Sequence, residues 1–496
     1  MRDELIADAE NLRGEIQRKE FLDLCEQKKS TILTILNERY GPDSGSPHPK
    51  SENRTFISPS EIDVRNCDGE RSFHNDEHAK FIAGSTTDTL AHLYFLNYFK
   101  DGVSTGEVMA QLEEAYLKGT LTGEEAEKFE FTKSIEVVAY GHDLVQNFNL
   151  MVGKDAHEEI GKVRVMETEA NENETILQLL TILVGSKDLP DLLEAVNVQV
   201  GQFNLTYIEL ITALRATIPT SNISNGSQRL GGGRVDLDVV QRDLMLLFRG
   251  IPKESTSLSW KDRRIYEAAF AVATSDLREL SGGPSAEEFM DSSHNLMREI
   301  KIGLQEYVDE NAAKLDNPEV QVEYAHMLRE IVPWYGTQEY FIWRQLAHFN
   351  ETLTGLHSVV DYPEFFKYMH EKYSTDNFTR NANAAEIFYS DLKKNFGRFI
   401  YQVYRERYDA WKDAPGRAIT LDYVFLNQIE RLFDVAERAE LSHWYDVEKG
   451  RFDDKHKAVY IGSMLRSVGF DVPDEFVEDE LVVTVKKINS PVPASA

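Results

Sequence analysis

The sequence predicts an all-α protein, and three observations support this fold class. Apolar residues recur at intervals of three and four through most of the chain, as they do on the buried face of helices. Gly- and Pro-rich segments lie between these stretches and not within them. The only short β-branched run is at residues 481–485, which predicts at most a single strand.

The N-terminal part is expected to be helical up to a break at Tyr40-Gly41-Pro42. Leu5, Leu12 and Ile16 begin an apolar series that continues at roughly helical spacing. Residues 1–40 are therefore interpreted as an N-terminal helical segment, and residues 41–60, rich in Gly, Pro, Ser and Asn, as a linker.

Residues 61–290 are interpreted as a helical core. Its first helix, residues 77–99, has an apolar side formed by Phe81, Ile82, Leu90, Leu93 and Leu96. The further expected helical segments are residues 101–123, 124–148, 156–183, 189–216 and 262–280. The three glycines at 231–233 are interpreted as part of a flexible loop, because no strand precedes them and no Gly-Lys-Ser/Thr follows.

The C-terminal half is aromatic and almost continuously helical in pattern, with breaks at Pro363 and Pro415. It gives a helical region over residues 291–478 and a tail over residues 479–496. The sequence leaves open whether this region is a separate domain or wraps the core.

Composition limits the class of protein. No run of about 18 apolar residues is present, so no membrane span or membrane partner is expected. Cys25 and Cys67 are the only cysteines, and no secretory signal is recognised, which favours the cytoplasm. The formal net charge of −30 argues against a nucleic-acid polymer as partner, whereas a small phosphorylated substrate remains compatible. A homo-oligomer is left open.

Two short stretches carry the candidate chemistry. His74 and His78 are four residues apart, so they share one face of a helix or of a loop leading into it. His142 and Asp143 follow the apolar stretch 135–140, on what is expected to be a helix. Adjacent side chains on a helix point about 100° apart, yet both can reach one ion held between packed helices.

These stretches resemble a known superfamily. The run Phe73-His74-Asn75-Asp76-Glu77-His78-Ala79 resembles the YHNxxHA motif of cyclic-nucleotide phosphodiesterases, with Phe in the place of Tyr. His78, then His142-Asp143, then a distant aspartate on a helix is similar to the H…HD…D order of HD-superfamily metal-dependent phosphohydrolases. The resemblance covers about residues 70–285 and implies an HD/phosphodiesterase-like helical bundle with a helical C-terminal extension. It departs from the phosphodiesterase pattern at residues 144–147, which contain no histidine.

The resemblance implies a divalent ion held by His78, His142, Asp143 and Asp276. Asp276 is preferred as the last ligand by resemblance and helical context, while Asp262, Asp243, Asp236 and Asp238 remain alternatives. Mixed nitrogen and oxygen ligands suit Mn, Mg, Fe, Co, Ni or Zn. Such an ion generates hydroxide near neutral pH and polarises phosphoryl oxygens. The implied catalytic residues are Asp143 and His74, the latter as the acid for the leaving oxygen or, alternatively, as a hydrogen-bond partner outside the ligand set.

Three further residues are weaker candidates for substrate binding. His157 lies where many HD proteins place a histidine that contacts a second metal or a phosphate, although a surface histidine is the plainer interpretation. Gln338 and Phe341 resemble the glutamine and phenylalanine that hold the purine in cyclic-nucleotide phosphodiesterases. A core phenylalanine beside a surface glutamine is the alternative.

The expected function is hydrolysis of a phosphoester, in particular of a nucleotide or cyclic nucleotide, by a metal-activated water. A second hypothesis is a catalytically silent HD-type scaffold or regulatory interaction protein that uses residues 290–478 as its partner surface. A third is an HD-type di-iron oxygenase, which would need extra ligands such as His157.

Overall fold

The computed structural model describes most of the chain. The described residues are 2–40, 73–100, 102–145, 148–151, 161–164, 170–185, 197–216, 258–278, 282–283, 285–300, 318–412 and 438–439. The predicted linker 41–60, the glycine loop, His157 and the C-terminal tail lie outside them.

Helices dominate the described residues, which confirms the all-α prediction. In chain order they are α1 (Arg2–Tyr40), α2 (Asp76–Tyr94), the short 3₁₀ helix η2 (Leu96–Tyr98), α3 (Thr105–Leu117), α4 (Gly123–Tyr140), α5 (Ala170–Val184), α7 (Tyr207–Arg215), α11 (Trp260–Leu277), α12 (Ala286–Ile300), α14 (Pro318–His357), α15 (Pro363–Lys372) and α16 (Thr375–Lys412). No helix among them combines the length and the apolar composition needed to cross a membrane.

One short ribbon interrupts the helical pattern. Strands β1 (Phe148–Met151) and β2 (Gly161–Arg164) pair antiparallel, with Phe148 opposite Arg164 and Met151 opposite Gly161. The predicted helices over residues 124–148 and 156–183 are therefore wrong at these ends. Strands of four residues are too short to show an alternating pattern, and their pairing depends on a partner that is distant in the sequence.

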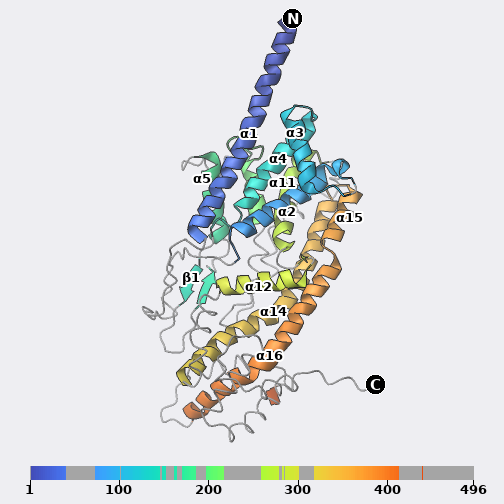
Figure 1. The fold of residues 1–496 in the computed structure, drawn as a ribbon. Coiled ribbons are helices and arrows are strands. Elements are labelled where there is room, and N and C mark those ends of the chain that lie inside the picture. The colour runs from blue at the N-terminus through green and yellow to red at the C-terminus, as the bar shows by residue number, and fades with distance from the viewer. Residues whose placement is uncertain are drawn as a thin grey trace, which may run out of the picture.

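The centre of the fold is the packing of α2 and α4 with α11 and α7, flanked by α1 (Figure 1). Helix α11 is buried over nearly all of its length, including Ala268, Ala269, Ala271 and Ala273. These short side chains allow neighbouring helices to approach closely. The position of α2 directly beside α11 brings together polar side chains that are far apart in the sequence.

Helix α1 is attached to this centre by polar contacts as well as apolar ones. Lys29 Nζ lies 2.9 Å from the Glu136 carboxylate on α4, and Arg39 donates to Gln178 on α5 across 2.8 Å. On its inner side, α1 buries Cys25 and Ile32 in the main hydrophobic core. The N-terminal segment that was expected to be helical up to Tyr40 is the single helix α1, and its second half packs against the core.

Helices α14 and α16 lie side by side as a long antiparallel pair (Figure 1). The rings of Tyr335 on α14 and Phe388 on α16 are 4.6 Å apart, and the ring of Phe349 on α14 is 4.7 Å from that of Tyr373, the C-cap residue of α15. The predicted break before Pro363 is confirmed, because α14 ends at His357 and α15 begins at Pro363.

The C-terminal helices also contact the centre of the fold. Lys372 Nζ lies 2.7 Å from Asp88 Oδ2 on α2 and donates to Thr89 Oγ1 across 3.1 Å. The Tyr373 hydroxyl donates to the carbonyl of Thr274 on α11. These bonds join α15 to the two helices that carry the candidate site.

Candidate metal centre

The start of α2 is fixed by Asn75, the third residue of the His-Asn-x-x-His-Ala run. Its backbone is extended, and its Oδ1 accepts from the backbone N–H groups of Glu77 (3.0 Å) and His78 (3.1 Å). This is the usual way in which an N-cap residue satisfies the free donors of a first helical turn. Asn75 therefore sets where the helix begins and hence where His78 lies.

Phe73 packs against both histidines of the run. Its ring centroid is 4.9 Å from that of His74 and 4.7 Å from that of His78, and the residue is buried. This apolar ring contacts both imidazoles without competing for their nitrogen atoms. The Phe that replaces Tyr in the resembling motif thus has a packing role here.

His142 and Asp143 do not lie on a helix as expected, but in the turn that follows α4. Helix α4 ends at Tyr140, with Gly141 as its C-cap. A Cβ added at position 141 would lie 2.7 Å from Leu179 Cδ1, so this position favours glycine because of the close approach of α5. In the turn, His142 Nδ1 donates to the carbonyl of Ala139 across 2.8 Å. In the neutral ring, Nε2 therefore presents its lone pair.

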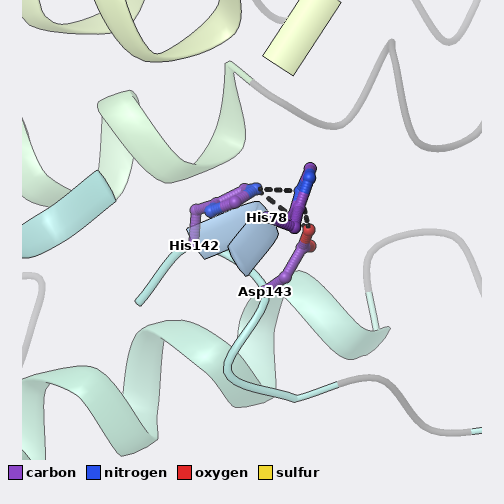
Figure 2. Close-up of side chains that lie close together, drawn as sticks. All are labelled: His78, His142 and Asp143. Carbon is purple, nitrogen blue, oxygen red and sulfur yellow. Dashed lines mark hydrogen bonds and ion pairs between the residues drawn. The ribbon is translucent and has the colours of Figure 1, made fainter. Parts of the chain in front are cut away.

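The three side chains converge on one point, as Figure 2 shows. The Nε2 atoms of His78 and His142 are 3.2 Å apart. Asp143 Oδ2 lies 3.2 Å from the former and 2.9 Å from the latter. The two imidazoles are buried, whereas the Asp143 side chain keeps 17% of its surface exposed. His78, His142 and Asp143 form a group that could hold a metal ion.

The spacing of these atoms fits a divalent ion. Ligands about 2.1 Å from an ion are about 3.0 Å apart at right angles to each other and about 3.4 Å apart in a tetrahedron. The three distances between ligand atoms, from 2.9 to 3.2 Å, lie close to the value for ligands at right angles. Imidazole nitrogen with carboxylate oxygen is a donor set that Mn, Fe, Co, Ni and Zn all accept.

Asp276 reaches the same cluster from the last turn of α11. Its Oδ1 lies 3.9 Å from His78 Nε2, and the residue is buried. This distance lies between the spacing of neighbouring ligands, about 3.0 Å, and that of opposite ligands, about 4.2 Å, on an ion with bonds of about 2.1 Å. Asp262, one of the alternatives, instead lies in the first turn of α11, where its carboxylate accepts from the Ser259 hydroxyl that caps the helix.

His74 lies beside the cluster. Its Nε2 is 3.7 Å from Asp143 Oδ2, which is beyond hydrogen-bond distance, and its side chain is nearly buried. It is therefore next to the groups that could hold an ion.

The electrostatics favour a positive charge at the centre. Burial by itself would raise the pKa of Asp143, but the imidazoles of His142 and His74 outweigh it and hold this pKa well below its usual range. Burial by itself would lower the pKa of His142, but the Asp143 carboxylate outweighs it, so the net pKa is raised. The Asp276 carboxylate acts in the same direction on His142. The field that stabilises an imidazolium here would equally stabilise a bound cation.

The remaining candidates have different positions. Gln338 and Phe341 are both nearly buried on α14, and Phe341 belongs to the main hydrophobic core, so the binding of a purine by this pair stays a prediction. His157 lies outside the described residues. His92, also on α2, stacks between the rings of Phe99 and Tyr368.

The sequence reasoning missed two residues near the cluster. Phe81 was expected on the apolar, buried side of its helix, yet it is 39% exposed, one turn after His78. Arg278 follows Asp276 by two residues and lies against the Phe81 ring, with its Cζ 5.9 Å from the ring centroid. Helical spacing alone gave no signal for this pair, because it depends on how α2 and α11 cross.

Comparisons of the chain with protein-family models, with curated proteins and with solved structures gave no match. The interpretation of the site therefore depends on its own geometry and chemistry.

Proposed function

We propose that this protein is a metal-dependent phosphohydrolase that acts on a small phosphoester, in particular a nucleotide or cyclic nucleotide. One observation carries the proposal: His78, His142 and Asp143 bring three ligand atoms within 3.2 Å of one another, and Asp276 adds a carboxylate 3.9 Å from His78. These side chains come from three separate parts of the chain, and the order is that of the HD superfamily.

The four side chains are the proposed ligands of the metal ion. His78, His142 and Asp143 would hold the ion, and Asp276 would complete the set from α11. A bound divalent ion would supply a water that loses a proton near neutral pH and can then attack phosphorus, and it would polarise the phosphoryl oxygens. The bond from His142 Nδ1 to the Ala139 carbonyl keeps that ring turned with Nε2 toward the cluster.

His74 is the proposed proton donor to the leaving oxygen. A histidine can donate a proton near neutral pH, and His74 lies beside the ligand set with its Nε2 3.7 Å from Asp143. His74 is not among the three side chains of the group that could hold a metal ion.

The charge of the protein supports a small substrate. A chain with a net charge of −30 repels a long nucleic-acid backbone, whereas a bound cation reverses the field locally and attracts a single phosphate.

The test is a panel of phosphoesters assayed with added Mn²⁺, which includes nucleoside mono- and triphosphates and cyclic nucleotides. We expect release of phosphate or a nucleoside monophosphate by the wild-type protein and loss of it in His142→Ala and Asp143→Ala. His74→Gln should lower kcat by about 10²–10⁴-fold while still binding Mn²⁺. The matched control is His370→Ala, which removes an exposed histidine of α15. Hydrolysis that is unchanged in Asp143→Ala would contradict the proposal.

A further inference from the structure

Two side-chain contacts join α2 to the C-terminal end of α11 beside the candidate metal centre. In the first contact, His78 Nε2 lies 3.9 Å from Asp276 Oδ1. In the second contact, Arg278 lies over the ring of Phe81, with its Cζ 5.9 Å from the ring centroid. Phe81 is one turn after His78 on α2, and Arg278 is two residues after Asp276. A helical turn advances about 5.4 Å, so this pair is directly next to the ligand cluster.

Phe81 is a large apolar residue on the exposed side of α2, which also carries Glu77, Lys80 and Gly84. Ile82, which follows it, is fully buried, and Ser85, one turn later, is 5% exposed, yet Phe81 is 39% exposed. Phe81 therefore lies at the exposed edge of α2, one turn after His78. An aromatic ring that remains in contact with water at the edge of a polar site is a surface on which another ring can stack.

Arg278 has no carboxylate partner among the described residues. Other cations that pack around α11 do have one: Arg263 lies 3.2 Å from Glu267, Arg264 lies 3.0 Å from Glu209, and Lys372 lies 2.7 Å from Asp88. In a chain with 84 acidic and 54 basic residues, a half-buried arginine that has no such pair among the described residues is well placed to bind an external anion.

We propose that Phe81 and Arg278 form the substrate-binding edge of the metal centre, where Arg278 binds phosphate oxygens and Phe81 stacks on an aromatic base. A planar guanidinium binds phosphate through two parallel hydrogen bonds. An aromatic face stacks on any base, with little dependence on which base it is. The ligand class is thus a nucleoside phosphate or another phosphoester with an aromatic ring. This inference rests on the proposed function for the identity of the substrate, and it adds two residues that bind it.

The test measures binding and does not depend on turnover. The metal-free protein is titrated calorimetrically with adenosine 5′-monophosphate, with adenosine and with inorganic phosphate. Arg278→Ala should weaken binding of the monophosphate by about tenfold or more and leave adenosine unaffected. Phe81→Ala should weaken the binding of the monophosphate and of adenosine by about tenfold, and Phe81→Tyr should restore the binding of both. Matched controls are Lys367→Ala, which removes an exposed positive charge of α15, and Leu177→Ala, which removes an exposed apolar side chain of α5.

The outcomes separate this inference from the proposed function. If both variants lose binding while the wild-type protein hydrolyses no phosphoester, the binding edge stands and the proposed hydrolysis falls. If the wild-type protein hydrolyses nucleotides and the two variants keep its KM, the hydrolysis stands and the binding edge falls. Absence of binding by the wild-type protein, or equal binding by Arg278→Ala and Phe81→Ala, would also overturn the inference. Thermal melting of each variant checks that the fold is retained.

Discussion

His78 and Asp276 are far apart in the sequence, yet His78 Nε2 lies 3.9 Å from Asp276 Oδ1 across the contact between α2 and α11. The small side chains of α11 permit this approach, and the Asn75 cap sets the position of His78 on α2. The candidate centre therefore depends on local features of both helices. Each of these two features can be altered by a substitution that leaves every proposed ligand atom unchanged.

The cap at Asn75 gives the first prediction. Asn75→Ala should destabilise the protein by ~1 kcal/mol, because two N–H groups at the start of α2 lose their acceptor. Asn75→Asp should keep most of the stability, since aspartate is an equally good cap. Denaturant unfolding measures both changes. Mn²⁺ affinity should fall in Asn75→Ala, and an unchanged stability in that variant would show that the cap is not needed.

The ion pair between Asp88 and Lys372 gives the second prediction. Removal of one partner, in Asp88→Asn or Lys372→Met, should cost about 3–5 kcal/mol, because the other charge stays buried at the interface of α2 and α15. The double variant Asp88→Asn with Lys372→Met should be less destabilised than the sum of the single variants. A double-mutant cycle by denaturant unfolding checks this. Additive effects would mean that the two charges do not act as a pair.

His348 on α14 gives a prediction about pH. It is buried, and among the described residues neither ring nitrogen has a hydrogen-bond partner. Burial, aided by the charge of Arg344, lowers its pKa to about 4 from the usual 6.5. Between these values the unfolded chain binds more protons than the folded one, so this residue makes the protein less stable as the pH falls from about 6.5 to 4, by up to about 3 kcal/mol.

His348→Leu should remove this part of the pH dependence. It should also raise stability at neutral pH by about 1–3 kcal/mol, because it removes unpaired buried polar atoms. The measurement is denaturant unfolding of both proteins at pH 7.5 and pH 5. If the difference in unfolding free energy between them does not grow at the lower pH, His348 is not the group responsible.

The sequence predicted much of this architecture because its signals are local. Helical spacing identified α1, α2 and α11, and the break before Pro363 followed from proline chemistry. The convergence of His78 with His142 and Asp143 was expected from an ordered motif. The turn that holds His142 and Asp143 was missed, because an apolar stretch does not show where its helix ends without the packing of Leu179 against Gly141.

Other features depend on contacts that no local pattern contains. The ribbon of β1 and β2 requires two short strands to find each other. The exposure of Phe81 depends on which parts of α2 are packed against other helices. Its contact with Arg278 depends on how α2 and α11 pack against each other. Periodicity assigns a residue to a face of a helix, but the neighbours that cover that face come from the whole fold.

The central claim is that His78, His142, Asp143 and Asp276 bind one divalent ion together. Calorimetric titration of the metal-free protein with Mn²⁺, followed by elemental analysis of the dialysed protein, tests it most directly. We expect stoichiometric binding by the wild-type protein and by His370→Ala, loss of that binding in His142→Ala, and clear weakening in Asp276→Asn. Mn²⁺ binding of equal strength in wild-type and His142→Ala protein, or none in either, would contradict it.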